Sequence, residues 1–332
     1  MGKIDFLQSD KVKAEAMRLG FSACGLAEAA PVAEERAAAI RQWLAKGCHA
    51  DMDYLARNLD KRLDPRLLVD RARTVVSLAV NYYTADGLSP HGYRFARYAL
   101  GRDYHDVVKE MLRRLMHALG LDEPIHGRPF VDTAPIDERY WAMQAGLGWQ
   151  GRSGQLIIPH AGTYFFLGEL VLTLPADCYD SPLAGRCGTC HSCVDACPAN
   201  ALPGDGTVDA RRCLSYLTIE NRGELPPGTG KRMGGCVYGC DRCSEVCPWN
   251  RFARPTAIDA FQPSEALRSM TADAWRNLTV EDYRRLFKGS AVKRAKYGGL
   301  VRNIAAVTQA GGESSADSSY DPAFPEDGET ET

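Results

Sequence analysis

The spacing of apolar residues predicts alternating helices and strands through the first half of the chain. Apolar side chains recur every three or four positions, as in amphipathic helices, at 9–19, 32–46, 104–119 and 136–145. Apolar runs that predict buried strands lie at 74–80, 130–132 and 164–174. Because helices and strands alternate, we expect a mixed α/β (α+β) domain over residues 1–177.

Two cysteine motifs carry the most specific chemistry in the sequence. The first has the spacing C-x2-C-x2-C-x3-C-P and consists of Cys187, Cys190, Cys193, Cys197 and Pro198. This run binds [4Fe-4S] clusters in bacterial two-cluster ferredoxins, where the fourth cysteine reaches the other cluster. An imperfect second copy consists of Cys240, Cys243, Cys247 and Pro248. We therefore expect a ferredoxin-like module with two [4Fe-4S] clusters over residues 178–250.

The spacing also predicts which cysteines share a cluster. Two-residue gaps let three thiolates of one tight loop reach three iron atoms, while the cysteine before each proline crosses to the other cluster. One cluster is predicted on Cys187, Cys190, Cys193 and Cys247. The other is predicted on Cys197, Cys240, Cys243 and either Cys213 or Cys236, and the spacing does not decide between the last two.

Zinc and disulfides are the alternative uses of such cysteines. CxxC pairs also bind zinc, but two copies of a CxxxCP run favour iron–sulfur clusters. Disulfides are disfavoured because the N-terminal residues lack the charged-then-apolar order of a secretory signal. No apolar run reaches the roughly 18 residues that cross a membrane. We therefore expect a cytoplasmic protein with no membrane segment.

Charge is unevenly distributed, although the formal net charge of the 332 residues is only −2. Residues 311–332 contain seven acids and neither lysine nor arginine, which predicts a disordered acidic tail. The remainder then carries a formal charge of about +5. Residues 251–310 are expected to form a short C-terminal helical segment. Nothing in the sequence indicates an obligate partner, so a monomer is expected.

The C-terminal helical segment is strongly basic. Six cations are candidates for contacts with nucleic acid: Arg284, Arg285, Lys288, Lys293, Arg294 and Lys296. Phe287 and Tyr297 lie among them, and clustered cations with flat rings can bind phosphates and stack on RNA bases. A solvated helix face is the alternative and is the commoner origin of such a run.

Asp132 is the candidate catalytic residue. It follows a predicted strand in the sequence Val131 to Pro135, at a strand end where catalytic groups are often presented. A carboxyl group in apolar surroundings there would have a raised pKa and could donate a proton. An aspartate that caps the helix expected from Ile136 is an equally good interpretation of the spacing.

Several stretches in order along residues 50–305 resemble the epoxyqueuosine reductase family, cobalamin- and iron–sulfur-dependent enzymes that complete the queuosine base of tRNA. The matching stretches are Met52–Arg57, Arg97–His105, Val131–Pro135, Ala145–Gly151, Phe165–Glu169, Asp209–Glu220, Tyr238–Cys240 and Phe287–Tyr297. The resemblance implies that Asp132 is the proton donor and that Cys213 completes the second cluster. It also implies cobalamin between the two domains, with candidate contacts from Arg57, Asp132, Arg152 and Ser215.

The implied reaction is the two-electron reduction of epoxyqueuosine to queuosine at the wobble position of tRNA. Electrons from an external low-potential donor would pass through both clusters to cobalamin, and the basic segment would contact the tRNA. One alternative is a related corrinoid reductase of a small molecule, similar to reductive dehalogenases. Another is a ferredoxin-like electron carrier, which would need neither a domain of this size nor Asp132.

Overall fold

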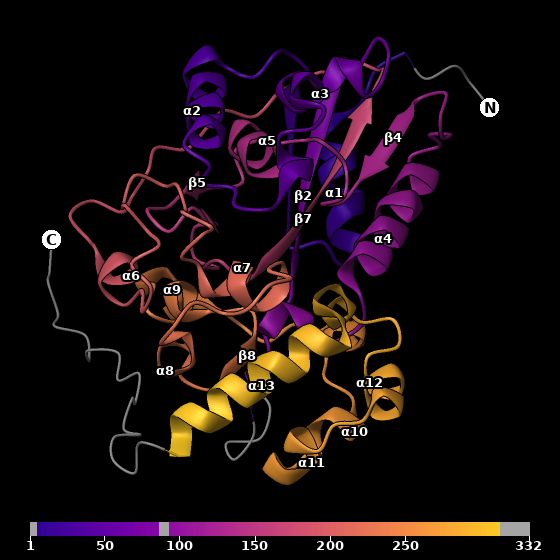
Figure 1. Cartoon of the computed structure of the whole chain (residues 1–332). Coiled ribbons are helices and arrows are strands. Elements are labelled where there is room, and N and C mark those ends of the chain that lie inside the picture. Colours follow the sequence, from indigo (N-terminus) through magenta and orange to yellow (C-terminus); the bar gives the residue numbers. More distant parts are fainter. Residues whose placement is uncertain (1–4, 86–92, 313–332) are drawn as a thin grey trace, which may run out of the picture.

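A four-stranded antiparallel sheet with strand order β1-β2-β7-β4 organises the first part of the chain (Figure 1). The computed structural model describes residues 5–85 and 93–312. The strands are β1 (Ala23–Glu28), β2 (Thr74–Asn81), β7 (Phe165–Leu172) and β4 (Gly127–Phe130). Across the two central strands Ser77 pairs with Glu169, and Glu169 also pairs with Phe130 on the edge strand. The sheet is therefore of the α+β type, and the strands are not joined as in parallel α/β folds.

Helices cover both faces of this sheet. On one face Leu78 and its neighbours pack against α1 (Ser9–Arg18) and α4 (Tyr104–Ala118). On the other, Val75 and Val171 pack against α5 (Glu138–Gln144), with α2 (Glu34–Ala45) and α3 (Leu59–Leu63) on the same side (Figure 1). Because both faces are covered, the central strands are apolar at nearly every position and do not alternate with polar residues.

The predicted helices and strands of this part are confirmed in position. The strand expected over 130–132 is the exception, since β4 ends at Phe130 and leaves Asp132 in the loop that follows. Two short strands, β5 (Trp149–Gln150) and β6 (Leu156–Ile157), form a small hairpin before β7.

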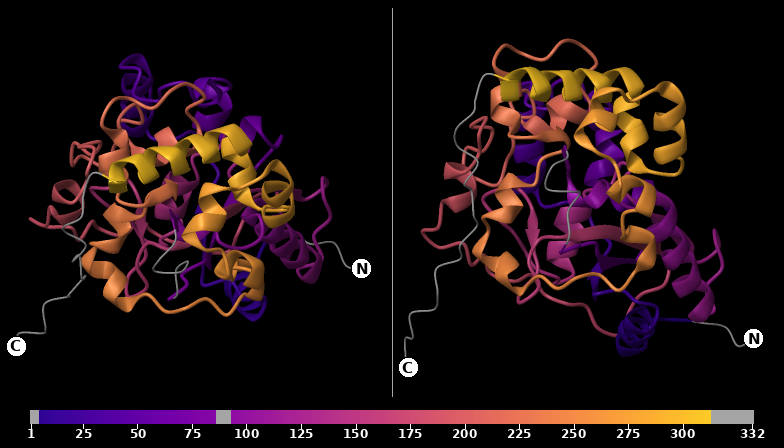
Figure 2. Two further views of the ribbon diagram at one scale, coloured as in Figure 1. Left: turned by 60° about the horizontal axis from the view of Figure 1, so that its bottom comes forward. Right: turned by 90° about the horizontal axis from the view of Figure 1, so that it is seen from below.

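The C-terminal part is mainly helical and is tied to the first part by a short parallel pair, β3 (Arg94–Phe95) with β8 (Cys236–Tyr238). The helices are α6 (Ser192–Asp195), α7 (Leu214–Ile219), α8 (Thr229–Met233), α9 (Arg242–Glu245), α10 (Glu265–Arg268), α11 (Ala272–Arg276), α12 (Val280–Leu286) and α13 (Lys296–Gly312). Helix α13 crosses this part and packs against α7, α8 and β8 (Figure 2).

Hydrophobic cores cross the expected domain limits. Phe95 and Leu100 pack with Trp275 and Phe287 from the C-terminal helices. Met52 packs against another core, around Leu214, and Cys197, Cys213 and Cys240 border the same core. The boundaries at 177 and 250 therefore remain predictions about sequence units, since the packing is continuous across them. Of the predicted acidic tail, residues 311–312 complete α13 and residues 313–332 lie outside the described residues.

No helix within residues 5–85 and 93–312 combines the length and apolar character needed to cross a membrane.

Candidate active site and iron–sulfur centres

Asp132 lies in the loop between β4 and α5 with a left-handed backbone, φ +50°. Its backbone N–H donates a hydrogen bond to Oε1 of Glu138, in the first turn of α5. A non-glycine residue in this region of φ typically costs about 1 kcal/mol or more, so the conformation depends on such surrounding contacts. Asp137, whose carboxylate accepts from the Tyr140 N–H, is the cap of α5. The capping interpretation of Asp132 is therefore wrong.

The Asp132 carboxylate receives two side-chain donors from the start of α4. The Tyr104 hydroxyl donates to Oδ2 at 2.7 Å, and Nε2 of His105 lies 3.0 Å from the same oxygen. Nδ1 of His105 lies 2.7 Å from Oδ1 of Asp103, the residue that also caps α4. The Asp132 side chain is still 56% exposed. A carboxylate–imidazole–carboxylate chain therefore ends at an accessible oxygen.

The pKa of Asp132 differs from the value that the sequence predicted, because of its hydrogen-bonded neighbours. Surrounding protein atoms disfavour its charge, but the hydrogen bonds from His105 and Tyr104 outweigh them and hold the pKa of Asp132 below its ordinary value. Burial likewise opposes the imidazolium, but Asp103 and Asp132 raise the pKa of His105 to about 9. The predicted raised pKa of Asp132 is therefore wrong. At neutral pH the proton of this pair resides on His105.

Two further carboxyl groups lie behind the Asp132 loop. Burial, followed by the charge of Asp132, raises the pKa of Glu138 to about 8. Burial also raises the pKa of Glu169 well above its ordinary range, with Glu138 the nearest acidic influence. Glu169 is 0% exposed, and neither of its carboxyl oxygens has a hydrogen-bond partner among the described residues. The pKa values of these two groups are thus raised, whereas the pKa of Asp132 is lowered, so Asp132 is the carboxyl group of this cluster that loses its proton most readily.

The first cluster's four predicted ligands are brought together. Burial raises the pKa of Cys247 to about 11, and Cys187, Cys193 and Cys190 add to the shift by charge repulsion. Gly151, in the loop after β5, lies beside this set, since a Cβ atom built there would be 3.6 Å from the Cys187 sulfur.

The second set of cysteines is also close together, in the region that faces Met52. Burial raises the pKa of Cys243 to about 12, and repulsion from Cys213, Cys193 and Cys197 contributes. Cys213 is likewise affected by Cys197. Cys236, the alternative ligand, is buried in β8 and its thiol hydrogen-bonds with that of Cys240. Cys213 thus has two predicted ligands as neighbours, and the ligand assignment remains a prediction.

The three other predicted corrinoid contacts differ in their surroundings. Arg57 is exposed and Ser215, in the first turn of α7, is partly exposed. Arg152 instead donates to two backbone carbonyls of the cysteine-rich segment, Gly204 O at 3.1 Å and Gly188 O at 2.9 Å. Its guanidinium therefore joins the two parts of the chain, and a contact of Arg152 with cobalamin remains a prediction.

The basic segment keeps its cations at the surface but not its rings. All six predicted contacts are exposed: Arg284, Arg285, Lys288, Lys293, Arg294 and Lys296. Arg285 pairs with Asp282, and Arg294 pairs with Glu220 and lies over the ring of Tyr54. Phe287 is 1% exposed within the C-terminal core. The expectation that Phe287 stacks on RNA bases is therefore wrong. Tyr297 donates from its hydroxyl to the Leu278 carbonyl and is partly buried.

Sequence reasoning missed the groups that complete the Asp132 site. Tyr104 and His105 lie in a stretch that resembles the family, but the order Asp-Tyr-His at a helix start gives no sign of the strand loop that it faces. Tyr54 was missed as well. Its ring is 41% exposed, and the charges of Glu220, Arg294 and Asp132 all affect its pKa. Tyr54 thus contacts the basic segment through Arg294 and is near enough to Asp132 to be affected by its charge.

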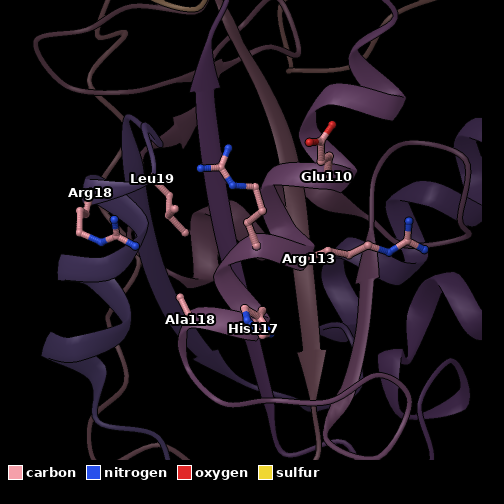
Figure 3. A pocket seen from close by; sticks show the side chains of 7 residues that line it. Arg18, Leu19, Glu110, Arg113, His117 and Ala118 are labelled. Atoms are coloured by element: carbon pink, nitrogen blue, oxygen red, sulfur yellow. The ribbon is translucent and has the colours of Figure 1, made fainter.

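A pocket of about 390 Å³ lies elsewhere, at the C-terminal ends of α1 and α4 (Figure 3). Its lining includes Arg18, Glu110, Arg113 and His117. Arg18 is paired with Glu15 and Arg113 with Glu123, so much of its positive charge is balanced. The Asp132 site lies at the opposite end of α4, where Tyr104 begins the helix.

The cysteine-rich segment and the fold define an iron–sulfur protein with a second, α+β domain. Residues 186–250 match the 4Fe-4S double cluster binding domain, which confirms the iron–sulfur module and overturns the zinc and disulfide alternatives. Residues 62–133 match the family described as epoxyqueuosine reductase QueG, DUF1730.

Curated relatives extend this match to most of the chain. The chain is 46% identical over 297 residues to the epoxyqueuosine reductase of Cyclobacterium marinum, which covers 88% of this chain and 94% of that one. It is 44% identical over 302 residues to the epoxyqueuosine reductase of Leadbetterella byssophila. This match covers 91% of this chain and 98% of the relative. The chain belongs to the epoxyqueuosine reductase family, as its motifs predicted.

Solved structures of this family share the fold. An epoxyqueuosine reductase crystallised with an epoxyqueuosine-modified tRNA-Tyr stem loop superposes with a TM-score of 0.82 at 26% identity, covering 91% of this chain and 80% of that one. The Bacillus subtilis enzyme, with its catalytic aspartate loop swung out of the active site, gives a TM-score of 0.80 at 25% identity, covering 91% and 81%.

Proposed function

We propose that this protein reduces epoxyqueuosine to queuosine at the wobble position of tRNA, with Asp132 as the proton donor and with two [4Fe-4S] clusters and cobalamin as cofactors. The observation that supports this most directly is the Asp132 carboxylate. It is held by Tyr104 and His105, is open to solvent, and occurs in a chain of the epoxyqueuosine reductase family. The protein would act in the cytoplasm as a monomer.

The residues between the second cysteine set and Asp132 fit a corrinoid. Met52 borders the same core as three of these cysteines, and Tyr54, two residues further on, is near enough to Asp132 to be affected by its charge. Arg57 and Ser215 would hold the polar side chains of the corrin ring. When bound, cobalamin would supply a low-valent metal centre able to reduce the epoxide-bearing ring, which no amino-acid side chain can do.

The protein's own residues would then manage the proton. The resting carboxylate of Asp132 is ionised and His105 is protonated. A substrate base placed over Asp132 removes water from the exposed carboxylate and so raises its pKa. The proton then moves from Nε2 of His105 to Oδ2 of Asp132 and from there to the departing epoxide oxygen. Two electrons and two protons convert the epoxide to an alkene and water.

The test is conversion under anaerobic conditions. Cluster-reconstituted protein with cobalamin, a low-potential reductant and epoxyqueuosine-containing tRNA should yield queuosine by nucleoside mass spectrometry, and omission of cobalamin should abolish it. If no queuosine forms while both clusters and cobalamin are shown to be bound, the proposal is wrong.

A further inference from the structure

The segment around Cys190 is the most open part of the iron–sulfur region. Cys190, of the first set, is the exposed member of the eight predicted ligands, whereas the other seven are all partly buried. The residues that precede it, 181–186, are exposed without interruption. An external protein can therefore approach the first cluster more closely than the second.

Residues from the second cysteine motif complete this surface. Trp249 contacts Trp149 edge-on, with ring centroids 4.9 Å apart, and a Cβ atom at Gly185 would lie 3.7 Å from the Trp149 ring. Phe252 lies beside His160, and the Arg251 guanidinium covers the Phe252 ring at 4.6 Å. These contacts place the segment 183–186 next to 249–252, so one face surrounds the first cluster.

This face is positively charged. Arg186, Arg251 and Arg254 are exposed, and none of them pairs with an acid in the part of the chain that the structure describes. An exposed acid, Asp195, lies close to Cys190 in the sequence, at the end of α6. Leu183 adds a partly exposed apolar side chain. Cations around an apolar, aromatic centre suit the transient docking of an acidic protein.

The face also lies apart from the substrate side. Helix α6, which carries Cys193, lies at one edge of the molecule, and α4 and α12 lie at the other (Figure 1). Asp132 is bound by residues at the start of α4, and the basic segment begins in α12. A donor at the first cluster would therefore leave the tRNA side free, so both partners could be bound during turnover.

We propose that the face formed by Arg186, Trp249, Arg251 and Arg254 around Cys190 is the docking site for an acidic one-electron carrier protein. Each encounter would oxidise the carrier by one electron, which the [4Fe-4S]2+ cluster held by Cys187, Cys190, Cys193 and Cys247 would accept. Two encounters supply the two electrons that epoxide reduction consumes. The docking site rests on the proposed function, for which it specifies the class of electron donor and the surface where that donor binds.

The experiment uses the reconstituted holoenzyme and follows bleaching of the cluster absorbance by anaerobic stopped flow. Reduced flavodoxin, an acidic flavoprotein, is the protein donor, and dithionite is the small-molecule donor. The test variant is Arg186→Glu/Arg251→Glu. The matched control is Lys11→Glu/Lys109→Glu, which changes the charge equally at two exposed positions of α1 and α4.

We expect the test variant to be reduced by flavodoxin at least tenfold more slowly than wild type at low salt, while its reduction by dithionite stays within twofold. Salt should slow the wild type and abolish the difference, because charges attract the carrier over distances that ions screen. Equal flavodoxin rates in test and control variants would overturn the proposal. Parallel loss of the dithionite rate, or weakened tRNA binding by the test variant, would overturn it too. Because the readout is cluster reduction, failure of queuosine formation is detected separately.

Discussion

The backbone N–H of Asp132 donates to the carboxyl group of Glu138, and this bond spans the turn that gives Asp132 its left-handed conformation. The bond fixes the direction of the Asp132 side chain, which is then shared between Tyr104 and His105. Glu138 is thus a positioning residue for the proposed proton donor, although it lies in the first turn of α5 and not in the loop.

Glu138→Ala should therefore lower turnover about tenfold or more by freeing the Asp132 loop, since small displacements of a catalytic group are costly. Glu138→Gln keeps an oxygen acceptor and should retain most of the activity. Single-turnover rates from nucleoside mass spectrometry measure both. Equal losses in the two variants would show that the acidic proton of Glu138 matters rather than its position.

Asp132→Asn should reduce turnover by about 100-fold or more, the range of general acid catalysis, while both clusters remain bound. The amide can accept the same donors but cannot deliver a proton at a useful rate. Cluster content is read from visible absorbance and iron analysis. Asp106→Asn, at an exposed site on α4, is the control and should be near wild type. Full activity of Asp132→Asn would mean that a group other than Asp132 donates the proton.

The pH dependence should be set by His105. A group with a pKa of about 9 holds its proton below that pH, so the supply to Asp132 is complete at neutral pH and is lost as the pH rises through 9. Single-turnover rates should fall above that pH. His105→Gln should be slower by about tenfold or more and should lack this basic limb. The control His117→Gln, at the far end of α4, should keep the limb.

Lysines of the basic segment should matter for tRNA affinity. Lys293 and Lys296 are exposed and have no ion pair with a described residue, whereas Arg294 is already paired with Glu220. Lys293→Glu/Lys296→Glu should weaken tRNA binding about tenfold or more and flatten its salt dependence. Filter binding against the Lys11→Glu/Lys109→Glu control tests this.

Phe287→Ala should lower the free energy of unfolding by about 3 kcal/mol, because its ring is in the core.

Arg152→Met should loosen the cysteine-rich segment. It removes two hydrogen bonds from a charged donor to Gly188 and Gly204, which we expect to cost about 2 kcal/mol of unfolding free energy. Anaerobic urea denaturation and cluster content would both report the loss. Arg152→Lys should recover part of it, because a lysine reaches one carbonyl at a time. Unchanged stability and cluster content would mean that these bonds are replaced by water.

The sequence was most informative where chemistry requires a local pattern. Cysteine spacing predicted the iron–sulfur module because the run C-x2-C-x2-C-x3-C-P, which places several ligands in one tight loop, is specific to such clusters. Apolar periodicity located α4 because its buried side chains, from Val107 to Met116, face a single core.

Contacts between segments that are far apart in the sequence could not be predicted from such local patterns. The pairing of Asp132 with Tyr104 and His105 depends on β4 lying beside β7 at the sheet edge over which α4 packs, an arrangement that no local spacing encodes. The predicted direction of the Asp132 pKa shift was wrong for the same reason, because the hydrogen bonds from Tyr104 and His105 determine that direction. The prediction for Phe287 was wrong because the local sequence, an aromatic residue among basic ones, is the same whether the ring faces RNA or packs in a core.

The parallel pairing of Arg94–Phe95 with Cys236–Tyr238 has a consequence for how the chain matures. During synthesis the earlier segment leaves the ribosome long before its partner exists, so Phe95 must stay without its final neighbours until the cysteine motifs and the C-terminal helices emerge. Closure of the core that Phe95 shares with the C-terminal helices must therefore come late in folding, after the cysteine motifs that lie between these segments have been synthesised.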